Sequence, residues 1–152
     1  MMRRTVWLDG DSVAREARRL AERHAGRRGY RLVVVADRPI PVSGENAVEF
    51  VLLEQGAEAV DSYLLSHAAS DDLVVTRDLP LMEALLEREV YVMNDRGERF
   101  TRESIGKRRS ERDMMEVLRR SGMVASAGPS YGKKEIKMFA DAFDSFLAKW
   151  LK

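Results

Sequence analysis

Carboxylates that follow buried strands are the residues of this chain best suited to chemistry. Asp9 and Asp11 come directly after the apolar run 6–8, and Asp61 and Asp78 fall where other elements of the same sheet should start or end. Carboxylates gathered at the ends of buried strands are costly unless something positive satisfies them. Hard divalent cations take oxygen ligands, so the pattern favours a Mg²⁺ or Mn²⁺ site and metal-dependent phosphate chemistry.

The D-x-D pattern at 9–11 is the sharpest of these signals. Both carboxylates can reach one ion, Gly10 lets backbone or ligand approach closely, and Ser12 adds a hydroxyl for the ion or a phosphate. A simpler interpretation is that Asp11 or Ser12 only caps the helix that follows. Asp78 has the same two interpretations, because the helix dipole favours a carboxylate at a helix start.

The remaining aspartates differ in how well a structural role explains them. Asp61 is hard to explain in that way, because it follows Val60 and lies one turn before two leucines near a helix start. Asp37 also follows a strand but adjoins a proline-containing loop, which makes it a second-rank candidate. Asp71 and Asp72 precede a strand and are predicted to be turn residues on the opposite edge of the sheet.

Positive charge is concentrated in the segments that flank an acidic centre. Residues 1–31 carry nine Lys/Arg against four acids, 96–121 carry nine against five, and 32–95 carry three against thirteen. Such a distribution suits a polyanion docking beside a metal site, although solvated helix faces would also produce it. Arg96 and Arg99 are the candidates for holding a phosphate bidentately. Further positive charge is expected from Lys107, Arg108 and Arg109.

Histidine and cysteine chemistry are not favoured. His24 and His67 fall on predicted helix faces toward the interior and are interpreted as core histidines, with no zinc-ligand spacing. The chain has no cysteine, which excludes a disulfide framework and a thiol nucleophile. No apolar run is long enough to cross a bilayer and no signal-peptide core follows the N-terminus, so we expect a cytoplasmic protein without a membrane partner.

The elements that must position these carboxylates are short apolar strands alternating with helices. Continuous apolar runs of this kind are typical of strands buried on both faces, and the alternation predicts a parallel α/β sheet covered on both sides. The carboxyl ends of parallel strands share one edge, where ligands bind. The predicted strands are 6–8, 32–36, 50–53, 73–76 and 90–93. The predicted helices are 11–25, 58–68, one starting near Pro80, one starting at a capping box at Ser110 with Met114, Val117 and Leu118 as its buried stripe, and 133–150.

Several motifs along the chain resemble the bacterial YaiI/YqxD family. The resemblance covers essentially the whole chain, and its most specific segments are D-L-V-V-T-x-D-x-P-L at 72–81 and N-x-R-G-E-R-F-T at 94–101. The family is similar to PIN-domain nucleases. The resemblance therefore implies one domain over 1–152: a PIN-like three-layer α/β/α sandwich with a mainly parallel five-stranded sheet and a helical extension over about 101–152. It also suggests RNA cleavage with Asp9, Asp11, Asp61 and Asp78 as metal ligands.

This chain departs from the family pattern at the first motif. Where the family has D-A-D-A-C-P, residues 9–13 read D-G-D-S-V, so the cysteine and proline are missing. Both aspartates are kept, but helix entry without proline is expected to be less rigid. Asp37 stands where asparagine is expected and adds negative charge near the cluster.

Three functions remain open on the sequence. The leading one is a Mg²⁺- or Mn²⁺-dependent PIN-like nuclease that hydrolyses phosphodiesters in single-stranded or structured RNA. The second is a non-catalytic RNA-binding or assembly module with the same fold. The third, a haloacid-dehalogenase-like phosphatase, is weaker because no lysine precedes Lys107 and that mechanism needs one.

The four carboxylates also predict a property of the metal-free protein. Because they repel each other, removing one should stabilise it.

Overall fold

The structure, a computed structural model, describes residues 4–56, 58–122 and 130–152. A six-stranded sheet in the order β3-β2-β1-β4-β5-β6 forms its centre. The strands are β1 Thr5–Asp9, β2 Arg31–Ala36, β3 Val48–Leu52, β4 Leu73–Val75, β5 Tyr91–Met93 and β6 Arg99–Phe100. The helices are α1 Arg15–Arg28, α2 Ala59–His67, α3 Leu79–Glu87, α4 Arg102–Arg120 and α5 Lys133–Trp150.

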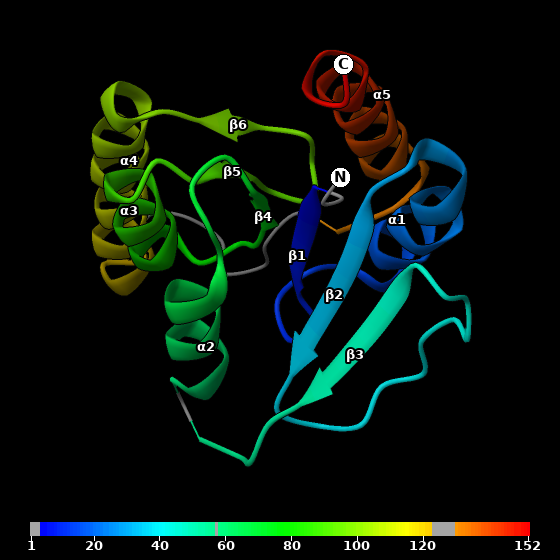
Figure 1. The fold of residues 1–152 in the computed structure, drawn as a ribbon. Coiled ribbons are helices and arrows are strands. Elements are labelled where there is room, and N and C mark those ends of the chain that lie inside the picture. Colours follow the sequence, from blue (N-terminus) through cyan, green and yellow to red (C-terminus); the bar gives the residue numbers. More distant parts are fainter. Residues whose placement is uncertain (1–3, 57, 123–129) are drawn as a thin grey trace.

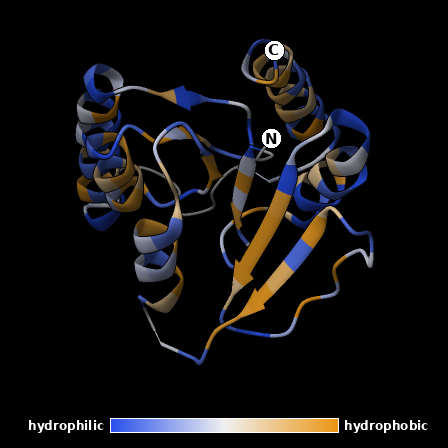
Figure 2. Cartoon of the chain, viewed as in Figure 1, coloured by the Kyte–Doolittle hydropathy of each residue, from blue (hydrophilic) through white to orange (hydrophobic). Residues whose placement is uncertain are grey.

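Helices cover both faces of this sheet, so the chain forms a three-layer α/β/α arrangement (Figure 1). Helices α1 and α5 lie on one side, and α2, α3 and α4 lie on the other. The alternation along β1 explains the two cores: Val6 and Leu8 pack toward α1 and α5, whereas Trp7 packs toward α2 and α3. The apolar strands and the more hydrophilic α4 are both evident in Figure 2.

The predicted fold class is confirmed, with one strand added. β1 to β5 are parallel, and β6 pairs antiparallel with β5 through Val92–Phe100 and Met93–Arg99. The sequence did not predict β6 because two residues are too short to show periodicity. Gly97, at φ +82°, allows the tight turn that brings β6 back to β5.

The order of the strands places β1 and β4 side by side at the centre. From β1 the chain builds β2 and β3 outward on one side, and it then returns to place β4 on the other side of β1. In open α/β sheets, the carboxyl ends of the strands flanking such a reversal form the crevice where ligands bind. The site is therefore expected just beyond Asp9 and Val75.

The prediction for α4 was wrong in its start and in its buried face. The helix begins at Arg102, where the Thr101 hydroxyl accepts a hydrogen bond from the Ser104 amide and the Ser104 hydroxyl accepts one from the Thr101 amide. Serine replaces the Glu or Gln that marks a capping box in sequence, so the signal was missed. Met114 and Val117 are 67% and 62% exposed, because only the first turns of α4 pack on the sheet layer.

Two smaller predictions also have clear outcomes. The interpretation of His67 as a core residue was wrong, because its ring is exposed and stacks on Tyr63 along α2. Asp72 lies at the opposite edge from the D-x-D motif, as predicted, and accepts a hydrogen bond from the Trp7 indole at 2.9 Å. The family resemblance also includes Gly128-Pro129, which lies outside the described residues. No helix in the described ranges is long and apolar enough to cross a membrane.

Candidate functional site

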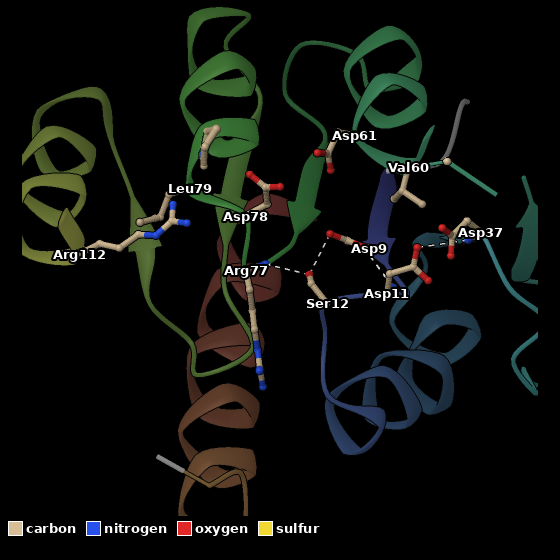
Figure 3. Close-up of a pocket in the computed structure, with 12 residues that line it drawn as sticks. Asp9, Asp11, Ser12, Asp37, Val60, Asp61, Arg77, Asp78, Leu79 and Arg112 are labelled. Atoms are coloured by element: carbon tan, nitrogen blue, oxygen red, sulfur yellow. Dashed lines mark hydrogen bonds between the residues drawn. The ribbon is translucent and has the colours of Figure 1, made fainter. Parts of the chain in front are cut away.

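A pocket of about 470 Å³ opens at the carboxyl edge between β1 and β4, and five aspartates line it (Figure 3). We call it the acidic pocket. Its aspartates are Asp9, Asp11, Asp37, Asp61 and Asp78, and its other lining residues include Ser12, Arg77 and Arg112. The four aspartates named by the D-x-D motif and the later candidates thus face one space, and so does the second-rank Asp37.

Asp9 is the fixed centre of the pocket. It ends β1 and is only 4% exposed. Its Oδ2 accepts hydrogen bonds from the hydroxyls of Ser12 and Thr76, both at 2.8 Å, and its Oδ1 accepts one from the Asp11 amide at 3.1 Å. A carboxylate has about four acceptor positions, so these three donors hold Asp9 in place and leave room for one more ligand.

Asp11 pairs with Asp37 on one side of Asp9. The Asp11 Oδ2 accepts a hydrogen bond from the Asp37 amide at 3.2 Å, while Oδ1 is buried with no hydrogen-bond partner among the described residues. Only the Arg38 Nε, 3.7 Å away, offsets that oxygen. Burial raises the pKa of Asp11, and the charges of Asp37 and Asp9 raise it further.

Asp61 and Asp78 form a second pair on the other side. Burial, followed by the charge of Asp78 and a hydrogen bond to its side chain, raises the pKa of Asp61 to about 7. Asp9 raises it as well. Two carboxylates this close cannot both ionise freely, so near neutral pH the pair holds a proton part of the time.

Asp78 keeps both of the roles that the sequence left open. Its Oδ1 accepts a hydrogen bond from the Leu81 amide at 2.9 Å, so it caps α3, and its side chain also lines the acidic pocket. For Asp11 and Ser12 the capping interpretation was wrong. Helix α1 begins after Ala14, and no side chain caps it. The Ala14 amide donates to the carboxylate of Asp95 at 2.8 Å.

Asp95 is a structural residue that the sequence did not single out. It is fully buried, and its Oδ2 binds Arg77 through Nε at 2.8 Å and Nη2 at 2.7 Å, in addition to the Ala14 amide. Tyr131 donates its hydroxyl to the Asp95 carbonyl at 2.6 Å, and the guanidinium groups of Arg77 and Arg96 both lie over the Tyr131 ring. Asp95 therefore fixes the start of α1 and the position of Arg77 beside the acidic pocket, which makes helix entry well defined without a proline.

Thr76 is the second residue that the sequence reading missed as part of the site. Its hydroxyl donates to Asp9 and accepts from the Asp78 amide at 3.1 Å, so one buried side chain links the ends of β1 and β4. This threonine belongs to the D-L-V-V-T-x-D segment that carries the family resemblance. Its role was not visible because it depends on β1 and β4 being neighbours.

The predicted phosphate-binding residues are not all brought to the pocket. Ser12 lines it, but its hydroxyl proton is directed at Asp9 and its oxygen accepts the Arg77 amide at 3.1 Å. Arg96 is not among the lining residues of the acidic pocket, and its guanidinium lies over the Tyr131 ring. Arg99 does not reach the site, because its guanidinium stacks over Phe146 on the α5 side of the sheet.

The carboxylates of the acidic pocket are suitable ligands for a hard cation, but they are arranged in two pairs, Asp11 with Asp37 and Asp61 with Asp78. In the ranges that the structure describes, no three His, Asp or Glu side chains lie close enough to hold one ion as they stand. Two features nonetheless fit a divalent cation. The first is the buried Oδ1 of Asp11, which has no hydrogen-bond partner among the described residues. The second is the pKa of Asp61, which burial and then the charge of Asp78 raise to about 7.

Comparison with known proteins gives a consistent relationship over the whole chain. A family model described as "Uncharacterized BCR, YaiI/YqxD family" matches residues 7–149. The chain is 35% identical to a UPF0178 protein of Psychromonas ingrahamii over 145 residues, which cover 95% of this chain and 96% of the relative. It is 36% identical to one of Treponema denticola over 147 residues, with 97% and 94% coverage, and 34% identical to UPF0178 protein GSU0171 of Geobacter sulfurreducens over 148 residues, with 97% and 98% coverage.

No solved structure matches the chain. The family model and these relatives span nearly all of the sequence, including every aspartate of the acidic pocket. The chain belongs to the YaiI/YqxD family.

Proposed function

We propose that the protein is a Mg²⁺- or Mn²⁺-dependent, PIN-like nuclease that hydrolyses phosphodiesters of RNA in the acidic pocket. One observation carries the proposal: five aspartates converge at the strand reversal, where burial and then the charge of Asp78 raise the pKa of Asp61 to about 7. A divalent ion would replace the shared proton and remove the repulsion between the carboxylates.

The aspartates have distinct parts in this proposal. Asp9, Asp61 and Asp78 would hold the ion, with Asp11 and Asp37 adding negative charge on the other side of Asp9. When bound, the ion would supply an activated water and charge stabilisation for the phosphate. Thr76 and Ser12 orient Asp9 by donating to its Oδ2, so they act as positioning residues.

Arginines supply the charge that a phosphate needs at the rim. Arg77 and Arg112 both line the acidic pocket, and Asp95 holds Arg77 rigidly in place. Arg77 already donates to Asp95 through Nε and Nη2, whereas Figure 3 shows the Arg112 guanidinium directed toward Leu79 and Asp78, where it can donate two parallel hydrogen bonds to phosphate oxygens. The proposal therefore assigns ion binding to the aspartates and substrate alignment to the arginines.

The decisive experiment compares wild type with Asp61→Asn on a fluorescent single-stranded RNA, in Mn²⁺ and in EDTA. We expect cleavage by wild type in Mn²⁺ only, a rise in melting temperature with Mn²⁺, and loss of both in Asp61→Asn. This variant keeps the size of the side chain and removes a repelling charge, so its loss of activity cannot come from unfolding. Asp113→Asn is the matched control, because Asp113 is exposed on α4 and forms no ion pair among the described residues.

The main competing function is the non-catalytic RNA-binding or assembly module. It predicts no Mn²⁺-dependent rise in melting temperature and no cleavage of any RNA. Cleavage that persists in EDTA, or that is equal in Asp61→Asn and wild type, would also refute the proposed site, because it would come from a contaminating nuclease or from other residues.

A further inference from the structure

A second pocket of about 420 Å³ lies beside the acidic pocket, between α3, α4 and the end of β5. The two pockets share three lining residues: Arg77, Leu79 and Arg112. They therefore form neighbouring parts of one surface at the carboxyl edge of the sheet. The shared arginines stand at the junction, and Figure 3 shows Arg112 reaching from α4 toward Leu79 and Asp78.

The charge of the second pocket is opposite to that of the first. Five arginines line it against a single acid, Glu111, so we call it the arginine pocket. The arginines are Arg77, Arg96, Arg108, Arg112 and Arg119. Like charges directed into one hollow repel each other, and an anion between them relieves that repulsion.

These arginines are not equally available to a ligand. Arg77 and Arg96 are held around Tyr131 and Asp95, Arg108 pairs with Glu98 at 3.0 Å, and Arg119 pairs with Glu116 at 3.5 Å. Arg112 forms no hydrogen bond or ion pair in the part of the chain that the structure describes. Among the described residues nothing occupies its five N–H donors, which lie where the two pockets meet.

Apolar side chains between the arginines favour a nucleic acid over a small anion. Met115 is 38% exposed and lines the arginine pocket, whose lining also includes the buried side chains of Phe100 and Met82. A surface that combines guanidinium groups with an exposed apolar side chain suits a single strand, which offers phosphates and base faces to such a surface. Inorganic phosphate would use only the arginines.

We propose that the arginine pocket binds a second phosphate of the RNA strand whose scissile phosphate lies in the acidic pocket, and that Arg112 aligns the strand between the two. This inference rests on the proposed function for the identity of the strand. It adds that substrate affinity resides largely in the arginine pocket, because the acidic pocket on its own repels a polyanion.

The test measures binding without chemistry. Fluorescence anisotropy with a fluorescein-labelled uridine dodecamer, in EDTA to prevent cleavage, is recorded over a range of salt concentrations. We expect Arg112→Gln to weaken binding roughly five- to tenfold, and to lower the slope of log affinity against log salt by about 0.7, the value for one phosphate contact on a single strand. Arg112→Lys should recover most of the affinity, because it keeps the charge.

The control is Arg27→Gln, which removes one exposed arginine from the last turn of α1, at the other end of the sheet. It should leave both affinity and salt slope unchanged. Equal affinity of wild type and Arg112→Gln would overturn the proposal, as would absence of binding by wild type or an equal loss in Arg27→Gln.

The outcome is separable from that of the nuclease assay. An Arg112-dependent salt slope without metal-dependent cleavage would support the arginine pocket and refute the nuclease. Cleavage by wild type with no effect of Arg112→Gln on binding would refute the arginine pocket alone. Melting temperatures of the variants check folding, and Arg112→Gln should match wild type because Arg112 has no ion pair to lose in the described residues.

Discussion

Replacing Asp61 with asparagine should stabilise the metal-free protein, and the gain should grow with pH. The pKa of Asp61 rises from 3.8 to about 7 in the folded protein. Between these two values the folded state binds more protons than the unfolded state, so the free energy of unfolding falls as pH rises. Asparagine does not ionise and can donate a hydrogen bond to the Asp78 carboxylate, so Asp61→Asn should remove this fall.

The size of the effect follows from the pKa change. At about 1.4 kcal/mol per pH unit, the interval from 3.8 to about 7 sets a ceiling of about 4 kcal/mol on the destabilisation of wild type above pH 7. Asp61 is only partly buried, so solvent screening reduces this to about 1–2 kcal/mol. For a domain of 152 residues, that corresponds to a melting temperature about 3–6 °C higher for the variant at pH 8.

The assay is urea unfolding followed by circular dichroism in EDTA, at pH 5, 6, 7 and 8, for wild type, Asp61→Asn and Asp113→Asn. Wild type and Asp113→Asn should lose stability together as pH rises, while Asp61→Asn should change less and become the most stable at pH 8. A variant less stable than wild type at pH 8 would refute the reasoning, because it would mean that the Asp61 carboxylate is stabilised by its surroundings. Saturating Mn²⁺ should reverse the order, since only wild type keeps the full set of ligands.

Three further substitutions test other parts of the site. Asp9→Asn should destabilise the metal-free protein by about 1–3 kcal/mol in thermal unfolding, because the new amide would place its own donors against groups that already donate to Asp9; equal stability would show that these hydrogen bonds contribute little. Asp95→Ala should cost about 2–4 kcal/mol in urea unfolding, since it leaves the Ala14 amide and Arg77 without their shared acceptor, and should also weaken RNA binding. Gly97→Ala should lower the melting temperature by several degrees, because its Cβ would lie 2.6 Å from the Met138 carbonyl at a φ of +82°; an unchanged melting temperature would show that the β5–β6 turn is not fixed by this contact.

The contacts keep the prediction that removing one carboxylate stabilises the metal-free protein for Asp61 and reverse it for Asp9. Asp9 has three hydrogen-bond donors on its carboxylate, whereas the pKa of Asp61 reports mainly burial and repulsion. The sequence makes the two residues look equivalent, because both are aspartates near strand or helix ends. Only the positions of Ser12 and Thr76 distinguish them.

The sequence by itself determined the class of fold and the edge on which the site lies. Continuous apolar runs indicated strands buried on both faces, as β1, β2 and β4 are, and the helical segments between most of them indicated parallel crossovers. An aspartate just after such a strand must then lie on the carboxyl edge, which is why Asp9, Asp37 and Asp78 could be placed without coordinates. These inferences are local, because each depends on residues close together in the chain.

The tertiary structure decided which of those residues face each other and which arginines line the acidic pocket. Strand order joins Thr76 to Asp9, sixty-seven residues away, and carries Asp95 to the start of α1. Arg99 was misplaced because the alternation along β6 turns it toward Phe146, and Arg112 was overlooked because its place beside the acidic pocket depends on how α4 packs against α3. Long-range pairing and side-chain direction depend on the whole fold, and no local pattern in the sequence records them.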